Sequence, residues 1–234
     1  MQVEVVADPE AAAARAAALI AEAGAAAVAE RGTFSLAVSG GSTPWRMLAL
    51  LADSELPWSS TDLFQVDERI AEPGSEDRNL THLLLALPIS AQASVRPMPV
   101  TGADLDAAAR EYEAALPERL DLVHLGLGPD GHTASLVPGD GVLEVGDRRV
   151  AITAGDYQGR PRMTLTYPAL ATARRIIWLV TGAEKREALE KLIASDPSIP
   201  AGRVDNDNMY LVADEAATGV RRSSEQNPES TNQT

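Results

Sequence analysis

Four short segments of this sequence place glycine, hydroxyl, imidazole or charged side chains directly after apolar runs that are typical of β-strands. They are Ser39-Gly-Gly-Ser-Thr-Pro44, Asp67-Glu-Arg69, Gly126-Leu-Gly-Pro-Asp-Gly-His132 and the turn that leads to Lys185. In open α/β sheets, ligands bind beyond the carboxyl ends of the strands, where such segments gather. The combination predicts a pocket with one end that holds an anion and another end that moves a proton.

The segment that ends in His132 is the best candidate for acid–base chemistry. Neutral histidine is suited to general-base work near pH 7, and Asp130, two residues earlier, is placed to orient it. The three glycines of the segment favour a tight turn before the ring. A capping or packed histidine explains this residue equally well when it is taken alone. His124 falls inside a predicted strand and is expected to be packed there.

The segment at 39–44 is a candidate phosphate cradle. Gly40 and Gly41 allow the backbone to approach a ligand closely, and a helix that starts after them presents free N–H groups at the positive end of its dipole. Ser42 and Thr43 add hydroxyl donors. The segment is not a P-loop, because the Gly-Lys-Ser/Thr ending is missing. A plain strand-to-helix turn is the alternative.

Two cations are candidates to bind the anion. Arg69 stands in a run of three charges, where its guanidinium can form paired hydrogen bonds to a phosphate; a solvated turn in which Asp67 pairs with Arg69 is the alternative. Lys185 is one of two lysines and falls in the first turn of a predicted helix, where it opposes the helix dipole unless an anion is bound. An exposed lysine tolerated at small cost is the other explanation. Arg160 and Arg162 are weaker candidates and are consistent with surface residues.

The elements that position these segments alternate between short apolar runs and helical patterns, which favours an α/β fold. We predict strands at residues 3–6, 34–38, 62–66, 120–125, 149–153, 163–166, 176–180 and 208–212, and helices at 9–31, 44–52, from 79, 104–116 and 183–194. The expected architecture is a Rossmann-like, mainly parallel sheet flanked by helices. Residues 1–220 are predicted to form a single domain, and the polar residues 221–234 a disordered tail.

Composition excludes several function classes. Twenty basic and 34 acidic residues give a net charge of −14, the opposite of what a nucleic-acid backbone or an acidic membrane surface requires. The absence of cysteine excludes disulfides, thiolate zinc sites and cysteine nucleophiles. No segment approaches ~20 uninterrupted apolar residues, and the alanine-rich stretch at 11–29 lacks the basic leader of a signal peptide. We expect a cytoplasmic protein that binds no nucleic acid, membrane or metal and is a monomer or a weak homo-oligomer.

Five motifs, in one order along the chain, carry a resemblance to a known family. They are Ser39-Gly-Gly-Ser-Thr-Pro44, Val66-Asp-Glu-Arg69, Gly126-Leu-Gly-Pro-Asp-Gly-His-Thr-Ala-Ser-Leu136, Arg162-Met-Thr-Leu-Thr166 and Val180-Thr-Gly-Ala-Glu-Lys185. Together they closely resemble the 6-phosphogluconolactonase family, over nearly all of the chain except the tail. Two positions depart from the family's pattern: Val137 stands where Phe is frequent, and Arg78-Asn79 stands where Ser-Asn is frequent. The second departure would add a basic contact.

The resemblance implies a fold similar to that of glucosamine-6-phosphate deaminases and ribose-5-phosphate isomerases. It implies hydrolysis of 6-phospho-D-glucono-1,5-lactone to 6-phosphogluconate, in the oxidative branch of the pentose phosphate pathway, with no metal or organic cofactor. His132 matches the family's catalytic base, and either Asp130 or Asp67 would orient it. The implied substrate-binding and phosphate-binding residues are Gly40, Gly41, Ser42, Thr43, Arg69 and Lys185.

Two other functions stay open. Glucosamine-6-phosphate deaminases also carry Asp-Gly-His, but an Ile-Ala-Phe-Asn type of sequence typically follows it. Here Thr133-Ala-Ser-Leu136 follows, which favours the lactonase. A non-catalytic phosphosugar sensor, as in the effector domains of transcription regulators, would require a DNA-binding module, for which the sequence offers neither the room nor the charge.

Overall fold

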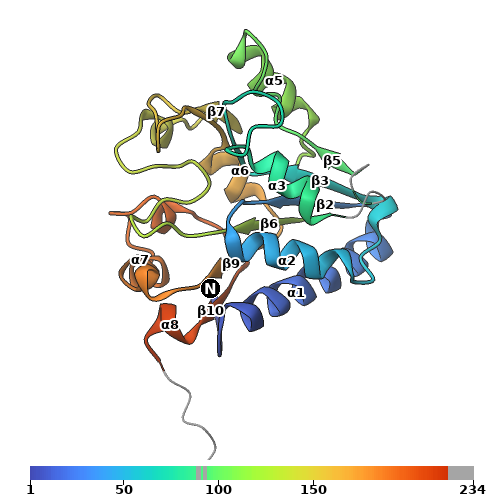
Figure 1. Cartoon of the computed structure of the whole chain (residues 1–234), viewed down its shortest axis with the longest axis vertical. Helices are drawn as coiled ribbons and strands as arrows, with labels where there is room; N and C mark the ends of the chain where they lie inside the picture. The colour runs from blue at the N-terminus through green and yellow to red at the C-terminus, as the bar shows by residue number, and fades with distance from the viewer. Residues whose placement is uncertain (88–90, 92–93, 221–234) are drawn as a thin grey trace, which may run out of the picture.

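The computed structural model describes residues 1–87, 91 and 94–220, so the predicted tail at 221–234 lies outside the described residues. The main sheet has seven strands, and every neighbouring pair in it is parallel. In sheet order they are β1 (Gln2–Val6), β10 (Met209–Asp214), β9 (Ile176–Val180), β6 (Leu122–Leu125), β2 (Phe34–Val38), β3 (Thr61–Gln65) and β5 (Val95–Arg96). The predicted parallel α/β sheet is confirmed (Figure 1), and β5 is a strand that the sequence analysis missed.

Helices cover both faces of this sheet. One hydrophobic core holds side chains from α1 (Pro9–Arg31), α2 (Ser42–Ala52) and α3 (Asn79–Ala86); the other holds side chains from α5 (Leu105–Ala115), α6 (Tyr167–Thr172), α7 (Arg186–Ile193) and α8 (Glu215–Thr218). Strand β9 shows the division, since Ile177 and Leu179 enter the first core and Ile176, Trp178 and Val180 enter the second. A strand covered on both faces reads as an unbroken apolar run, which is why β9 was predicted at its observed bounds.

Helix α1 begins and ends where the sequence predicts. Asp8 Oδ1 accepts a hydrogen bond from Ala11 N at 2.8 Å, Pro9 occupies the first turn, and Gly32 ends the helix with a φ of 81°. By length and composition alone, this helix could cross a membrane. In the fold, its Leu19 and Ile20 are buried in the core that α1 shares with the sheet.

Three short strands form a second, antiparallel sheet, which the sequence analysis did not predict. β4 (Asp67–Arg69) pairs with β8 (Arg162–Leu165), and β8 pairs with β7 (Val150–Ile152). Val66 joins the two sheets, because its N–H donates to Val38 O at 3.1 Å and its carbonyl accepts from Leu165 N at 2.7 Å. The alternative of a solvated turn at Asp67 to Arg69 is therefore wrong, since these residues extend as a strand.

The four candidate segments follow four strands that lie side by side in the sheet, in the order β9, β6, β2 and β3. Because these strands are parallel, their carboxyl ends meet at one edge. Two boundaries differ from prediction there. Helix α2 begins at Ser42, two residues early, and the helix predicted from Ala183 is a 3₁₀ turn, η3 (Ala183–Lys185), followed by α7.

Candidate active site

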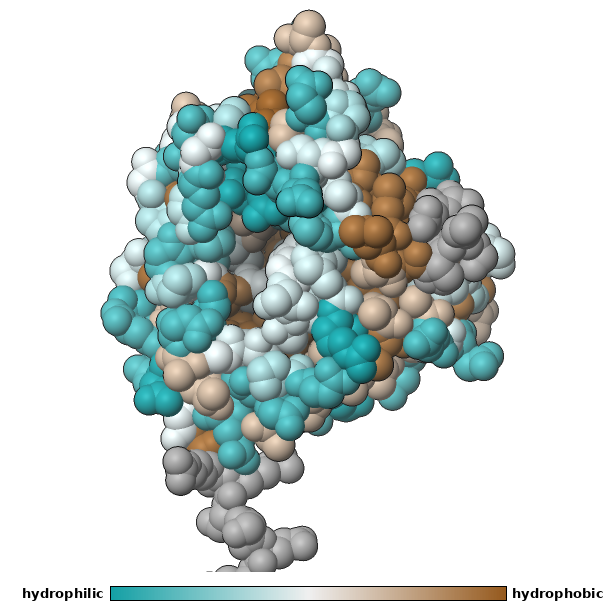
Figure 2. Space-filling view, viewed as in Figure 1, coloured by the Kyte–Doolittle hydropathy of each residue, from teal (hydrophilic) through white to brown (hydrophobic). Residues whose placement is uncertain are grey.

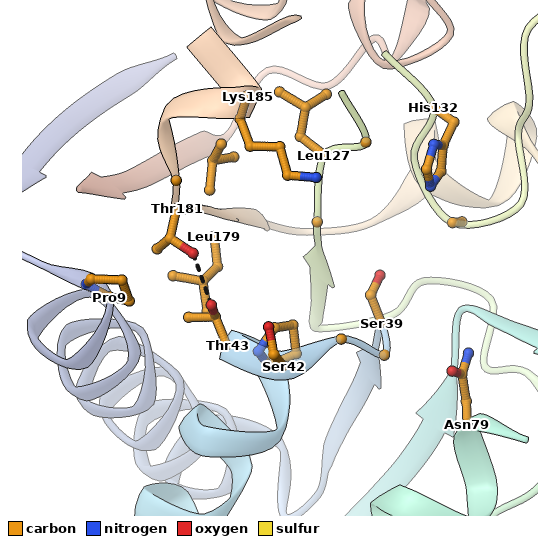
Figure 3. A pocket seen from close by; sticks show the side chains of 18 of the residues that line it. Pro9, Ser39, Ser42, Thr43, Asn79, Leu127, His132, Leu179, Thr181 and Lys185 are labelled. Atoms are coloured by element: carbon orange, nitrogen blue, oxygen red, sulfur yellow. Dashed lines mark hydrogen bonds between the residues drawn. The ribbon is translucent and has the colours of Figure 1, made fainter. Parts of the chain in front are cut away.

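The loop after β6 presents His132 to the edge of the sheet. Gly131 N donates to Gly128 O at 3.0 Å, and Gly128 N donates to His132 O at 2.8 Å, which closes a tight turn. Gly131 has a φ of +83°, and an added Cβ would lie 2.5 Å from Ile199 Cβ. Only glycine therefore fits at this position. The turn directs the His132 ring toward an open space at the end of the sheet (Figure 3).

Asp130 holds the His132 ring. Its Oδ1 lies 2.5 Å from His132 Nδ1. A carboxylate partner keeps the proton on Nδ1 and leaves the lone pair of Nε2 free; no hydrogen bond to Nε2 occurs within the described part of the chain. Partial burial raises the pKa of Asp130, but the hydrogen bond and the charge of His132 outweigh burial and lower that pKa below its usual value. Asp130 is thus an ionised acceptor at neutral pH.

Asp67 has different partners from those predicted. It is buried at the start of β4, where Ser135 Oγ donates to its Oδ2 at 2.6 Å and Arg162 Nη1 lies 3.9 Å from the same oxygen. Burial raises the pKa of Asp67, and the Ser135 hydrogen bond with the Arg162 charge only partly opposes that increase. No hydrogen bond joins Asp67 to His132 among the described residues. Of the two candidate acids, Asp130 is the one in contact with the ring.

The middle residue of the charged run, Glu68, is structural. Successive residues of a strand point to opposite faces, so Glu68 turns away from Asp67 and Arg69 and is fully buried. Its carboxylate accepts from Asn79 N at 2.7 Å and Leu80 N at 2.9 Å, at the start of α3. Arg78 is also buried, with Nε 3.5 Å from Glu68 Oε2. The expectation that Arg78 adds a basic contact to the ligand is therefore wrong.

Asn79 connects the two outer residues of the same run. Its Nδ2 donates to Asp67 O at 3.0 Å, and its Oδ1 accepts from Arg69 Nη1 at 2.8 Å. Arg69 Nη1 also donates to Asp77 O at 2.9 Å. These bonds hold the Arg69 side chain by one nitrogen and leave the rest of its guanidinium fork available to a ligand.

The loop after β2 brings backbone close to this network. A Cβ added at Gly40 would lie 2.3 Å from Asn79 Oδ1, and Gly41 has a φ of +133°, so both positions require glycine. Gly41 is the N-cap of α2 and provides no side-chain acceptor for the first-turn amides. Those amides can therefore receive an anion. Thr43 Oγ1 lies 2.8 Å from Thr181 Oγ1, which ties α2 to the loop after β9 (Figure 3).

Lys185 lies in η3 and is also the N-cap of α7. Its ammonium group extends into the space that His132 and the hydroxyls of Ser42 and Thr43 also face (Figure 3). Lys185 forms no ion pair with any described residue. The other lysine, Lys191, is paired, with its Nζ 2.8 Å from Glu187 Oε1. A half-buried, unpaired cation at the start of a helix is well placed to bind an anion.

These residues line one open cavity of about 630 Å³, visible as a hollow in Figure 2. Seven charged residues line it: Glu10, Arg46, Asp67, Arg69, Arg162, Glu184 and Lys185. Arg46 forms an ion pair with Glu10, with Nη2 2.5 Å from Oε1, and Arg162 forms one with Asp67. Arg69 and Lys185 form no ion pair within the described part of the chain. Glu184 is the remaining anion, so the lining carries four cations and three anions, a net positive charge in a protein whose net charge is −14.

The sequence analysis gave Arg162 too little weight as a residue of the site. This residue is 5% exposed and lines the cavity, so it is not a surface residue. Arg160 behaves as expected of a surface residue, with Nε 2.7 Å from Asp77 Oδ2. The polar partner Asn79 and the tyrosine Tyr157, whose hydroxyl lies 3.2 Å from His132 Nδ1, were also missed. Asn79 and Arg162 belong to segments that the resemblance includes, but Tyr157 belongs to none of them, so no local signal indicated it.

The remaining histidine of interest, His124, is packed as predicted. It is fully buried in β6, and burial lowers its pKa to about 3, so it stays neutral. Among the described residues, no group of three or more His, Asp or Glu side chains could hold a metal ion. Of the described histidines, His132 is the one that lines the cavity.

Known proteins resemble this chain along most of its length. The sequence model of the family described as glucosamine-6-phosphate isomerases/6-phosphogluconolactonase matches residues 7–213. A 6-phosphogluconolactonase of Synechocystis sp. is 39% identical over 186 residues, which is 73% of this chain and 75% of that protein. One from Nostoc sp. is 35% identical over 214 residues, or 84% of this chain and 88% of that protein.

Solved structures agree with the sequence comparison. A 6-phosphogluconolactonase from Shewanella baltica has a TM-score of 0.83 at 25% identity and covers 92% of this chain and 97% of that one. A monomeric glucosamine-6-phosphate deaminase has a TM-score of 0.82 at 18% identity, over 94% of this chain and 100% of that one, and shows a shared fold. The chain belongs to the family of glucosamine-6-phosphate isomerases and 6-phosphogluconolactonases.

Proposed function

We propose that this protein is a 6-phosphogluconolactonase, which hydrolyses 6-phospho-D-glucono-1,5-lactone to 6-phospho-D-gluconate in the pentose phosphate pathway. Relatives that carry this name are 35–39% identical to the chain. The observation that carries the mechanism is His132, with Nδ1 bound to Asp130 and Nε2 free, in a cavity that also holds two unpaired cations. The site thus combines a base with a place for a phosphate.

The phosphate would bind at the end of the cavity formed by the first turn of α2, Arg69 and Lys185. First-turn amides and the hydroxyls of Ser42 and Thr43 supply neutral donors, and the two cations supply charge. Hydrogen bonds to charged groups contribute roughly 1.5–3 kcal/mol each, so three or four of them account for micromolar binding. Binding by a local cluster also overcomes the repulsion between an anionic substrate and an acidic protein.

The reaction requires one proton to move twice. Nε2 of neutral His132 accepts a proton from a water molecule, whose oxygen attacks C1 of the lactone. Backbone N–H groups at Gly40 and Gly41 would stabilise the negative charge that develops on the carbonyl oxygen. The bond from C1 to the ring oxygen then breaks, and protonated His132 gives its proton to that oxygen. The product acid ionises and releases one proton to solvent.

Several observations favour a lactonase over a deaminase. Thr133, Ala134 and Ser135 follow His132, and Ser135 is used by the fold to hold Asp67. The relatives at 35–39% identity are named lactonases, whereas the deaminase structure, at 18% identity, supports only the fold. A cytoplasmic location and a monomeric or weakly associating chain belong to the same proposal.

Proton release tests the proposed activity directly. Freshly prepared 6-phosphogluconolactone is added to the protein in weak buffer, and acid production is compared with spontaneous hydrolysis. We expect release well above that background. A rate equal to buffer alone would contradict the proposal, and glucosamine 6-phosphate, with ammonia release as the readout, would then test the deaminase.

Gly128→Ala is predicted to reduce turnover by moving the base. The added Cβ would lie 1.9 Å from His132 Nδ1 and 2.6 Å from Asp130 Oδ1, so the ring must shift. A small displacement of a reacting group is costly, and we expect kcat to fall about tenfold with KM within about twofold. Gly102→Ala, where an added Cβ would meet nothing within 4 Å, is the control. Unchanged kinetics in Gly128→Ala would show that the ring position is not critical.

A further inference from the structure

We propose that Tyr157 is a positioning residue that holds Asp130 and His132 in the geometry required of the base. The inference rests on the proposed function of His132. Tyr157 comes from the turn between β7 and β8, a part of the chain that none of the motifs includes. Its hydroxyl lies 3.1 Å from Asp130 Oδ2 and 3.2 Å from His132 Nδ1.

The turn that carries Tyr157 is well defined. Tyr157 N donates to Arg160 O at 3.0 Å, and the two residues between them, Gln158 and Gly159, have φ values of 54° and 80°. Positive φ at both central positions is the mark of a tight two-residue hairpin turn. The tip of the hairpin is thus a defined two-residue turn, and the tyrosine hydroxyl reaches Asp130 and His132 from it.

The contacts of Tyr157 complete the hydrogen bonding of Asp130. One carboxylate oxygen, Oδ1, takes the proton of His132 Nδ1, and the other, Oδ2, accepts from the Tyr157 hydroxyl. With both oxygens bound, the carboxylate plane cannot rotate away from the imidazole. The tyrosine ring also packs edge-on against the His132 ring, with centroids 5.0 Å apart and planes at 60°. Both the acid and the base are therefore held by one side chain.

Arg162 also contacts Tyr157. Its guanidinium carbon lies 5.1 Å from the centroid of the tyrosine ring, and its Nη2 donates to Tyr157 O at 3.1 Å. This arginine is itself fixed by burial beside Asp67. The tyrosine ring thus contacts both the buried guanidinium and the imidazole, which connects Asp67, through Arg162, to the proposed base.

Tyr157 acts through its neighbours rather than on the substrate. Neither Tyr157 nor Asp130 is among the described residues that line the cavity, whereas His132 is. Burial and the nearby charge of Asp130 raise the pKa of the Tyr157 hydroxyl, so it remains protonated and donates. A residue in this position should affect kcat and leave KM unchanged.

A double-mutant cycle tests this role. Tyr157→Phe keeps the ring and its contact with Arg162 and removes only the hydroxyl. We expect kcat for 6-phosphogluconolactone to fall about 3- to 10-fold with KM unchanged. In the Asp130→Ala background, the same substitution should change kcat by less than about 1.5-fold, because the carboxylate that accepts from the hydroxyl and orients the imidazole is absent. Tyr167→Phe is the matched control, because it also removes a hydroxyl that donates one hydrogen bond, to Pro200 O at 3.0 Å. The Tyr167 ring likewise contacts an arginine, with the guanidinium carbon of Arg203 5.0 Å from the ring centroid.

Three kinetic results would overturn the proposal: an unchanged kcat in Tyr157→Phe, an equal loss in both backgrounds, or a rise in KM alone. A second readout requires no substrate. In ¹⁵N spectra of the histidine rings, with the His132 signals assigned by their loss in His132→Gln, Tyr157→Phe should shift the His132 nitrogens and leave those of His124 unchanged. Unmoved signals would overturn the positioning role. If the native protein fails to hydrolyse the lactone, the proposed function is lost, and the spectra still decide the role of Tyr157.

Discussion

His132→Ala is expected to lower kcat by about 10²–10⁴-fold and to leave KM within about twofold, because general-base assistance contributes that much to such reactions. In the proposed mechanism the imidazole contacts the attacking water and does not hold the phosphate. Its loss therefore removes a group that acts only in the transition state. Initial rates of proton release over a range of lactone concentrations give both constants.

The control for this prediction is His82→Ala. His82 stacks on Trp45 with ring centroids 5.7 Å apart, and its Nε2 lies 2.8 Å from Glu76 O. Like His132, it is half-buried, but it does not line the cavity. Thermal unfolding of both variants should resemble that of the native protein. Full turnover in His132→Ala would remove this residue from the mechanism.

Lys185→Ala and Arg69→Ala are expected to raise KM by about 10- to 100-fold each, with a smaller effect on kcat. A charge-assisted hydrogen bond contributes roughly 1.5–3 kcal/mol, and each 1.4 kcal/mol corresponds to about a factor of ten in binding. Both cations lack an ion-pair partner among the described residues, so their removal leaves no carboxylate unpaired. For Lys185 the loss should therefore report on the substrate alone. Arg69→Ala also removes the hydrogen bonds from Arg69 to Asn79 Oδ1 and Asp77 O, so its thermal unfolding is measured alongside KM.

Lys191→Ala is the control for the lysine. Lys191 belongs to the same helical segment, but its ammonium is paired with Glu187 at 2.8 Å on the surface, and exposed pairs of this kind contribute little. The measurement is KM for the lactone and the inhibition constant of 6-phosphogluconate. If KM is unchanged in both Lys185→Ala and Arg69→Ala, the phosphate does not bind at this end of the cavity.

The sequence by itself determined the parallel sheet and the parts of the site that belong to local motifs. Strands β2 and β9 were predicted at their observed bounds, because a strand covered on both faces is a mainly apolar run, unbroken in β9 and interrupted only by Ser35 in β2. Helix α1 was predicted at residues 9–31, because Asp8-Pro9 is typical of a helix start. The hydrogen bond between Asp130 and His132 joins residues two apart, so the short segment that contains them was sufficient to suggest it.

Only the tertiary structure decided which distant groups meet at the cavity. The sequence left open whether Asp130 or Asp67 orients His132; Asp67 contacts Ser135 and Arg162, because β4 leaves the main sheet and pairs with β8. Arg162 and Tyr157 reach the site through that second sheet and its hairpin. Strands β7 and β8 were predicted to within two residues at each end, but their pairing with the charged segment Asp67–Arg69 was not. Three consecutive charged residues carry no apolar pattern that indicates a strand, and contacts across 25 or more residues depend on pairing that no local preference encodes.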